Sequence, residues 1–169
     1  MIAEPDRIEL RNAVQRALER LRREFPLEQR LATADAGARH SYAVILRHWL
    51  RGVVPQPGDV PVPDLETLQR LDAIVPGPEG LGCYPFSARP TGIDVTLPEA
   101  QLTAMCALDA LAVARLAGAR ADISASCLAC RVPLHIRVER DGALDHDQAD
   151  RARVAWLVHD ATTSCSDGL

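Results

Sequence analysis

Apolar residues recur at helical spacing through much of the first half of the chain. Between residues 7 and 25 they lie three and four positions apart, and Pro26 ends the pattern, so this segment is predicted to be a helix. Further helices are predicted over residues 38–51 and 64–75, the latter with its leucines on one stripe. The proline-rich stretch 53–63 is expected to connect these two helices.

The pattern changes to short extended segments after residue 75. Residues 81–86 and 93–97 flank a turn and are predicted to form a β-hairpin. Three helices followed by a hairpin predict a winged-helix-like domain over residues 1–97, with the wing at 81–97. The predicted third helix carries three acids and one Arg, and phosphate contacts need positive charge, so groove reading by this helix is disfavoured.

The second half combines one alanine-rich helix with several strands. The helix is predicted to open at Pro98 and to run to about residue 116. Strands are predicted over residues 121–126, 133–139 and 154–159. The predicted class is therefore α+β, with a second domain over residues 98–169 in which the helix packs on a small mixed β-sheet.

Composition and charge narrow the classes of function. The 169 residues are 47% hydrophobic, and no apolar run approaches the length of a membrane span. The N-terminus lacks the apolar segment of a signal peptide, so we expect a cytoplasmic protein without a membrane partner. Residues 1–52 carry ten Arg against seven acids, but the net charge of the whole chain is −4, which argues against nucleic-acid binding.

The chain holds five cysteines, which we expect to be reduced in the cytoplasm. Cys127 and Cys130 form a C-x-x-C pair, which is half of a zinc site, and the sequence offers no second half. A packing role, a metal site and a redox pair all remain open for these two thiols. Cys83 is interpreted as a packing residue, and Trp49 and Trp156 as core anchors.

Cys106 and Asp109 stand three residues apart within the predicted helix. Three residues is about one helical turn, so both side chains are expected on the same side. A carboxylate raises the pKa of a neighbouring thiol, which does not favour a simple nucleophile, but a soft cation bound to the sulfur would drive its deprotonation. On spacing alone, a buried cysteine and an exposed aspartate that merely share a turn is the favoured interpretation.

A longer set of residues changes that balance. The chain resembles the alkylmercury (organomercurial, MerB-like) lyase family over roughly residues 80–139. The resemblance is carried by Tyr84-Pro85-Phe86-Ser87, Pro90-Thr91, Val95-Thr96-Leu97, Ala104-Met105-Cys106-Ala107-Leu108-Asp109-Ala110-Leu111, Gly118, Ile123-Ser124, Ser126-Cys127 and Val132-Pro133. The Met-Cys-Ala-Leu-Asp-Ala-Leu run is the most specific part.

The resemblance implies cleavage of a carbon–mercury bond by protonolysis, in which two cysteines hold the mercury and an aspartate moves a proton to carbon. Cys106 matches the first cysteine and Asp109 matches the aspartate. No organic cofactor is implied; Hg(II) is bound as the product, and an external thiol is needed for its release. The implied partners are an organometallic small molecule and small thiols or a metal-accepting protein. The family's counterpart of Cys127 is mainly structural.

The second cysteine is where the sequence departs from the family. The family's second cysteine enters a late strand rich in aromatic residues, whereas Cys165 stands in a polar stretch and Leu169 follows it by four residues. Cys165 is the late cysteine and is therefore our candidate for the second mercury ligand. A catalytic domain truncated at its C-terminus is another interpretation. Thr103 also stands where a Tyr is common in the family.

Three functions from different classes remain open. The first is a lyase acting on an organomercurial or another organometal, which Cys106 with Asp109 favours. The second is a metal-binding or metal-sensing winged-helix protein, which the basic front segment with Cys127 and Cys130 would favour. The third is a catalytically inactive binding module of the same fold, which the missing late strand would favour.

Overall fold

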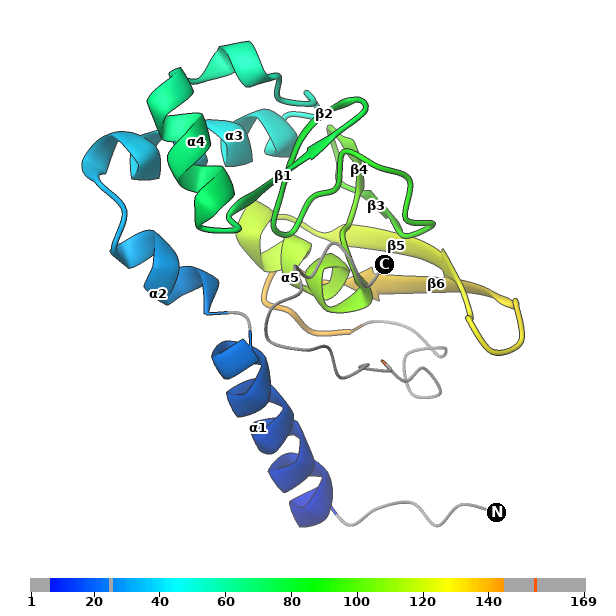
Figure 1. Ribbon diagram of the computed structural model, residues 1–169. Helices are drawn as coiled ribbons and strands as arrows, with labels where there is room; N and C mark the ends of the chain where they lie inside the picture. Colours follow the sequence, from blue (N-terminus) through cyan, green and yellow to red (C-terminus); the bar gives the residue numbers. More distant parts are fainter. Residues whose placement is uncertain (1–6, 25, 145–153, 155–169) are drawn as a thin grey trace.

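The computed structural model describes residues 7–24, 26–144 and 154 (Figure 1). In chain order its elements are α1 (Arg7–Glu24), α2 (Leu27–Ala32), α3 (Ala36–Leu50), the 3-10 turn η1 (Pro57–Asp59), α4 (Val62–Arg70), β1 (Ile74–Gly77), β2 (Gly80–Cys83), β3 (Asp94–Thr96), β4 (Gln101–Thr103), α5 (Ala107–Ala117), β5 (Ala121–Ser126) and β6 (Pro133–Val138). None of the helices in these residues is long and apolar enough to cross a membrane.

The predicted helices are confirmed at α1 and α3, and the third is shorter than predicted. Helix α3 begins at an aspartate cap, where the side chain of Asp35 accepts a hydrogen bond from the Ala38 backbone N–H at 2.8 Å. Helix α4 ends at Arg70, and Asp72 takes a positive φ of 54° that turns the chain into β1. A further helix, α2, directly follows Pro26 and was not predicted.

The predicted wing is wrong in its pairing. The hairpin is formed by β1 and β2, which pair antiparallel with Gly77 opposite Gly80. Residues 81–86 and 93–97 do not pair with each other. Strand β2 pairs with the preceding strand β1, whereas β3 pairs with β4 and β5. The turn residues Pro78 and Glu79 close this hairpin.

The α+β class is confirmed, but the sheet is antiparallel and not mixed. The strand order of the larger sheet is β4-β3-β5-β6, and each of its described pairings is antiparallel. The predicted strands over 121–126 and 133–139 correspond to β5 and β6. Helix α5 packs against β3 and β5, whereas α1 projects from the rest of the molecule (Figure 1). The predicted strand over 154–159 lies outside the described residues, apart from Val154.

One cluster of buried apolar side chains runs through both halves of the chain. It joins residues of α3 and α4, such as Ile45 and Leu68, to residues of the larger sheet and α5, such as Val95 and Val113. Trp49, predicted as a core anchor, is 3% exposed and stacks on Phe86 with ring centroids 5.7 Å apart. The boundary predicted between residues 97 and 98 stays a prediction.

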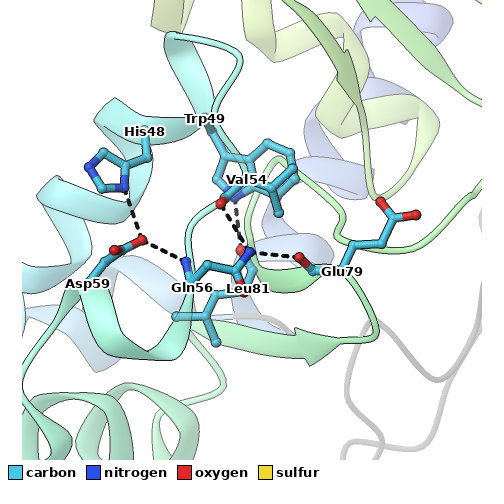
Figure 2. A network of polar contacts seen from close by, with 7 residues as sticks. All are labelled: His48, Trp49, Val54, Gln56, Asp59, Glu79 and Leu81. Atoms are coloured by element: carbon cyan, nitrogen blue, oxygen red, sulfur yellow. Dashed lines mark hydrogen bonds and ion pairs between the residues drawn. The ribbon is translucent and has the colours of Figure 1, made fainter.

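A polar network holds the connector after α3 against the β1–β2 hairpin (Figure 2). The Trp49 Nε1–H donates to the Leu81 carbonyl oxygen at 3.0 Å, and the Gln56 side-chain amide donates to the Glu79 carbonyl oxygen at 2.8 Å. Asp59 accepts from the Gln56 backbone N–H at 2.7 Å and lies 3.4 Å from His48. These contacts fix β2, which leads directly into the candidate site.

Candidate functional site: a cysteine–aspartate cap

Cys106 and Asp109 meet at the start of α5 and not in the middle of a longer helix. The helix predicted from Pro98 begins only at Ala107, because residues 101–103 form strand β4 and Cys106 is the N-cap. The Cys106 Sγ accepts a hydrogen bond from the Asp109 backbone N–H at 3.5 Å. In return, the Asp109 carboxylate accepts hydrogen bonds from the backbone N–H and the thiol of Cys106. The two residues therefore form a reciprocal cap with a thiol in the place usual for Ser or Thr.

Burial raises the pKa of the Asp109 carboxyl to about 6, and the hydrogen bonds from Cys106 oppose this shift. A carboxyl with this pKa exchanges protons readily near neutral pH, which suits a group that accepts and donates a proton within one reaction. Cys106 is half-buried and so keeps partial contact with solvent. The pair thus combines a reachable sulfur with a proton carrier in direct contact.

The segment before β3 lies beside this cap. Phe86 bridges to Ala104, and the Met105 backbone N–H donates to the Pro85 carbonyl oxygen at 2.9 Å. The Tyr84–Pro85 peptide bond is cis. These contacts hold the residues that lead into Cys106 against the loop that carries Tyr84, whose hydroxyl oxygen is buried. Two stretches of the family motif, about twenty residues apart in sequence, are therefore adjacent in space.

Tyr42 reaches the same region from α3. Its hydroxyl donates a hydrogen bond to the Tyr84 carbonyl oxygen at 3.0 Å. Burial raises the pKa of Tyr42 well above its usual value, and the charges of Cys83, Asp109 and Tyr84 raise it further. The phenol therefore stays protonated and lies within electrostatic reach of Asp109. Sequence reasoning missed Tyr42, because its contact with Tyr84 joins positions 42 residues apart.

Cys83 belongs to the same cluster through Tyr42. Its side chain is fully buried, and burial raises the pKa of its thiol strongly. The interpretation of Cys83 as a packing residue agrees with this burial. It stands at the end of β2, next to Tyr84, and is a neighbour of Tyr42, which also interacts with Asp109.

The C-x-x-C pair lies in the turn between β5 and β6, away from the core. Cys127 is half-buried and Cys130 is exposed. The pKa of the Cys127 thiol is lowered, first by the backbone N–H of Cys130 and then by that of Ala129 and by the Cys130 side chain. The four cysteines of the described residues are thiols and not disulfides. No group of three or more His, Cys, Asp or Glu side chains within those residues could hold a metal ion.

Cys165, the candidate second mercury ligand, and Trp156 lie outside the described residues. The structure therefore brings Cys106 and Asp109 together and leaves the position of Cys165 as a prediction. Tyr42 could not be predicted as a site residue, because a tyrosine on an amphipathic helix is ordinarily a packing residue and no local sequence pattern marks it otherwise.

The geometry can be compared with known proteins. Residues 86–168 match the family model of alkylmercury lyase, MerB, a range that includes Cys106, Asp109 and Cys165. The crystal structure of the mercury-bound form of MerB2 matches the chain with a TM-score of 0.61 and 20% sequence identity. That match covers 73% of this chain and 66% of the other, so the chain spans slightly less than two thirds of that protein. No curated protein sequence matches the chain.

The fold and the domain match define the class: the α+β fold is shared with MerB2, and residues 86–168 match the model of the alkylmercury lyase family. The resemblance read from the sequence is confirmed.

Proposed function

We propose that this protein cleaves carbon–mercury bonds by protonolysis, with Cys106 as a mercury ligand and Asp109 as the proton carrier. The observation that carries the proposal is the reciprocal contact between this thiol and this carboxyl at the start of α5. Mercury is a soft metal that prefers thiolate ligands, so a reachable sulfur attracts it. A carboxyl in contact with that sulfur can take the thiol proton as the sulfur–mercury bond forms.

The reaction balances with two thiols. The Cys106 sulfur binds the organomercury cation and passes its proton to the Asp109 carboxylate. A second thiolate binds the same mercury atom, its proton leaves to solvent, and the two sulfurs push electron density onto the carbon. The carbon–mercury bond then breaks, the carbon takes the proton from Asp109 as a hydrocarbon, and Hg(II) remains on two sulfurs.

The pKa of about 6 at Asp109 supports the proton step. A carboxyl at its ordinary pKa would be almost entirely ionised at neutral pH and would take a proton from a thiol with difficulty. Burial makes the protonated form accessible, and the hydrogen bond from Cys106 supplies a direct path. Tyr42 stays protonated, its hydroxyl is held by the Tyr84 carbonyl oxygen, and it lies close enough to Asp109 to interact with the ionised carboxylate that remains once carbon has taken the proton.

The second thiol is assigned to Cys165, which falls within the range matched by the family. Cys83 is the alternative, because it neighbours Tyr42, but its burial and raised pKa make its thiolate costly to form. The proposed substrate is therefore an organomercurial small molecule, with an external thiol or a metal-accepting protein taking the Hg(II).

The test is to incubate the full chain with a phenylmercury salt and excess small thiol, and to measure benzene in the headspace. The wild type should release benzene. Cys106→Ser should release none, and Asp109→Asn should slow release by about 10²–10⁴-fold, the range of a lost general acid. Glu66→Gln, which changes an exposed carboxyl on α4, is the matched control and should behave as the wild type.

Two further variants identify the second thiol. Loss of benzene in Cys165→Ala but not in Cys83→Ala supports the assignment, and the reverse pattern moves it to Cys83. A wild type that binds phenylmercury yet releases no benzene would overturn the lyase proposal.

A further inference from the structure

The turn between β5 and β6 is closed by its own backbone. The Arg131 N–H donates to the Cys127 carbonyl oxygen at 2.8 Å, and the Cys127 N–H donates to the Val132 carbonyl oxygen at 2.9 Å. Arg131 adopts a positive φ of 60°, which reverses the chain so that it can enter β6. The loop between the two cysteines is therefore a hydrogen-bonded turn of fixed shape and not an open linker.

This turn places the two sulfurs side by side. The backbone N–H groups of Cys130 and Ala129 and the Cys130 side chain lie close enough to the Cys127 sulfur to lower the pKa of its thiol. Backbone N–H groups directed at a sulfur stabilise its charge when a metal binds it. Since Cys130 is exposed and Cys127 is half-buried, a cation in solution can reach both thiols.

The surroundings limit which cation fits. Among the described residues, no third His, Cys, Asp or Glu completes a metal-ligand group at these thiols. A structural zinc ion ordinarily takes four protein ligands in tetrahedral geometry, so two thiols alone do not suit it. Two thiolates do complete the coordination of a soft ion that binds only two ligands, as Hg(II) does.

We propose that Cys127 and Cys130 form a second thiolate site, separate from Cys106, that binds a soft two-coordinate cation such as Hg(II). On binding, each thiol loses a proton to solvent and forms one sulfur–mercury bond, while two ligands such as chloride or small thiolates leave the ion. The metal stays Hg(II), so the step needs no oxidant or reductant.

The register of the larger sheet places both thiol sites at one end of it. Thr103 on β4 and Ser124 on β5 both pair with Asp94 on β3, so β4 and β5 run in the same direction. Cys106 follows Thr103 by three residues, and Cys127 follows Ser124 by three. Strands on either side of β3 are about 10 Å apart. A transfer of Hg(II) from the first site to the second would rest on the proposed function, whereas the binding itself does not.

The test uses the full chain carrying Cys106→Ser and Cys165→Ser, which removes both proposed lyase thiols. The variant is mixed with mercuric chloride and excess glutathione, desalted and weighed by native mass spectrometry. One mercury atom per chain should be retained, and Cys127 and Cys130 should be protected from alkylation. Adding Cys127→Ser or Cys130→Ser should lower retention at least about tenfold, because the second thiolate then has to come from solution.

Ser126→Ala, at the exposed end of β5, is the matched control and should retain the mercury. Circular dichroism checks that each variant is folded. The proposal is overturned if the starting variant retains no mercury, or if both single serine variants retain as much as it does. A chain lighter by two hydrogens and free of mercury would also overturn it, since the pair would then be a disulfide. Benzene release plays no part in these outcomes.

Discussion

Replacing Asp109 with asparagine should make the protein more stable at neutral pH, although it removes the proposed proton carrier. In the wild type, burial raises the pKa of this carboxyl from its ordinary 3.8 to about 6. The folded state therefore binds the proton more tightly than the unfolded state does. The stability that depends on this group is fully present below about pH 3.8 and is lost as the pH rises through about 6.

The size of the effect follows from the shift. A shift of about two pKa units corresponds to at most about 3 kcal/mol between the fully protonated and the fully ionised carboxyl. Asparagine carries no charge at any of these pH values, and its side-chain oxygen can still accept from the Cys106 backbone N–H. The stability of Asp109→Asn relative to wild type should therefore rise by about 2 kcal/mol between about pH 4.5 and about pH 7.5.

Urea unfolding of both proteins at these two pH values measures the difference directly. The wild-type and variant curves share the other titrating groups, so the pH dependence of the difference reports on Asp109. Asp122→Asn is a control of opposite sign: it breaks the 2.8 Å ion pair with Arg137 and should lower stability at neutral pH by up to about 1 kcal/mol. A difference between Asp109→Asn and wild type that is the same at both pH values would refute the reasoning.

Three further outcomes are expected. Trp49→Phe keeps an aromatic ring but removes the hydrogen bond to the buried Leu81 carbonyl, so it should lower the free energy of unfolding in urea by about 1–3 kcal/mol. An unchanged unfolding midpoint would contradict the network in Figure 2. Gly80→Ala should cost about 1–3 kcal/mol or more in the same assay, because φ is +150° and a Cβ would clash with the Pro55 carbonyl oxygen; tolerance of alanine would argue against this turn. Cys106→Ala removes the thiol donor, so the pKa of Asp109 should rise above about 6 in carbon-13 NMR titration, and a fall would disprove the thiol–carboxylate contact.

The sequence predicted α1 and α3 well because their apolar residues follow helical spacing over four or more turns. It failed where a few residues decide the path of the chain. The third helix was extended through Asp72, whose positive φ is uncommon for a residue other than glycine. The helix predicted from Pro98 overran β4, because cysteine is an unusual N-cap and gave no sign that a helix begins at Ala107.

The candidate site, too, was predicted in part. Cys106 and Asp109 were found from their spacing, since a separation of three residues brings side chains together both in a helix and in an N-terminal cap. The raised pKa of Asp109 was not foreseen, because burial depends on tertiary packing. The docking of α3 and β2 brings Tyr42 near Asp109 and Cys83 near Tyr42, and no local sequence pattern records such contacts.

The match to the alkylmercury lyase family begins at residue 86. Part of the surroundings of Asp109 comes from residues before that boundary. Tyr42 on α3 precedes that boundary and lies close enough to Asp109 to interact with it electrostatically, and its neighbours Cys83 and Tyr84 precede the boundary too. A fragment cut to the matched segment would lack Tyr42, so less of the protein would cover Asp109 and the pKa of its carboxyl should fall from about 6 toward its ordinary value. The first half of the chain thus contributes to the acidity of a group encoded in the second half.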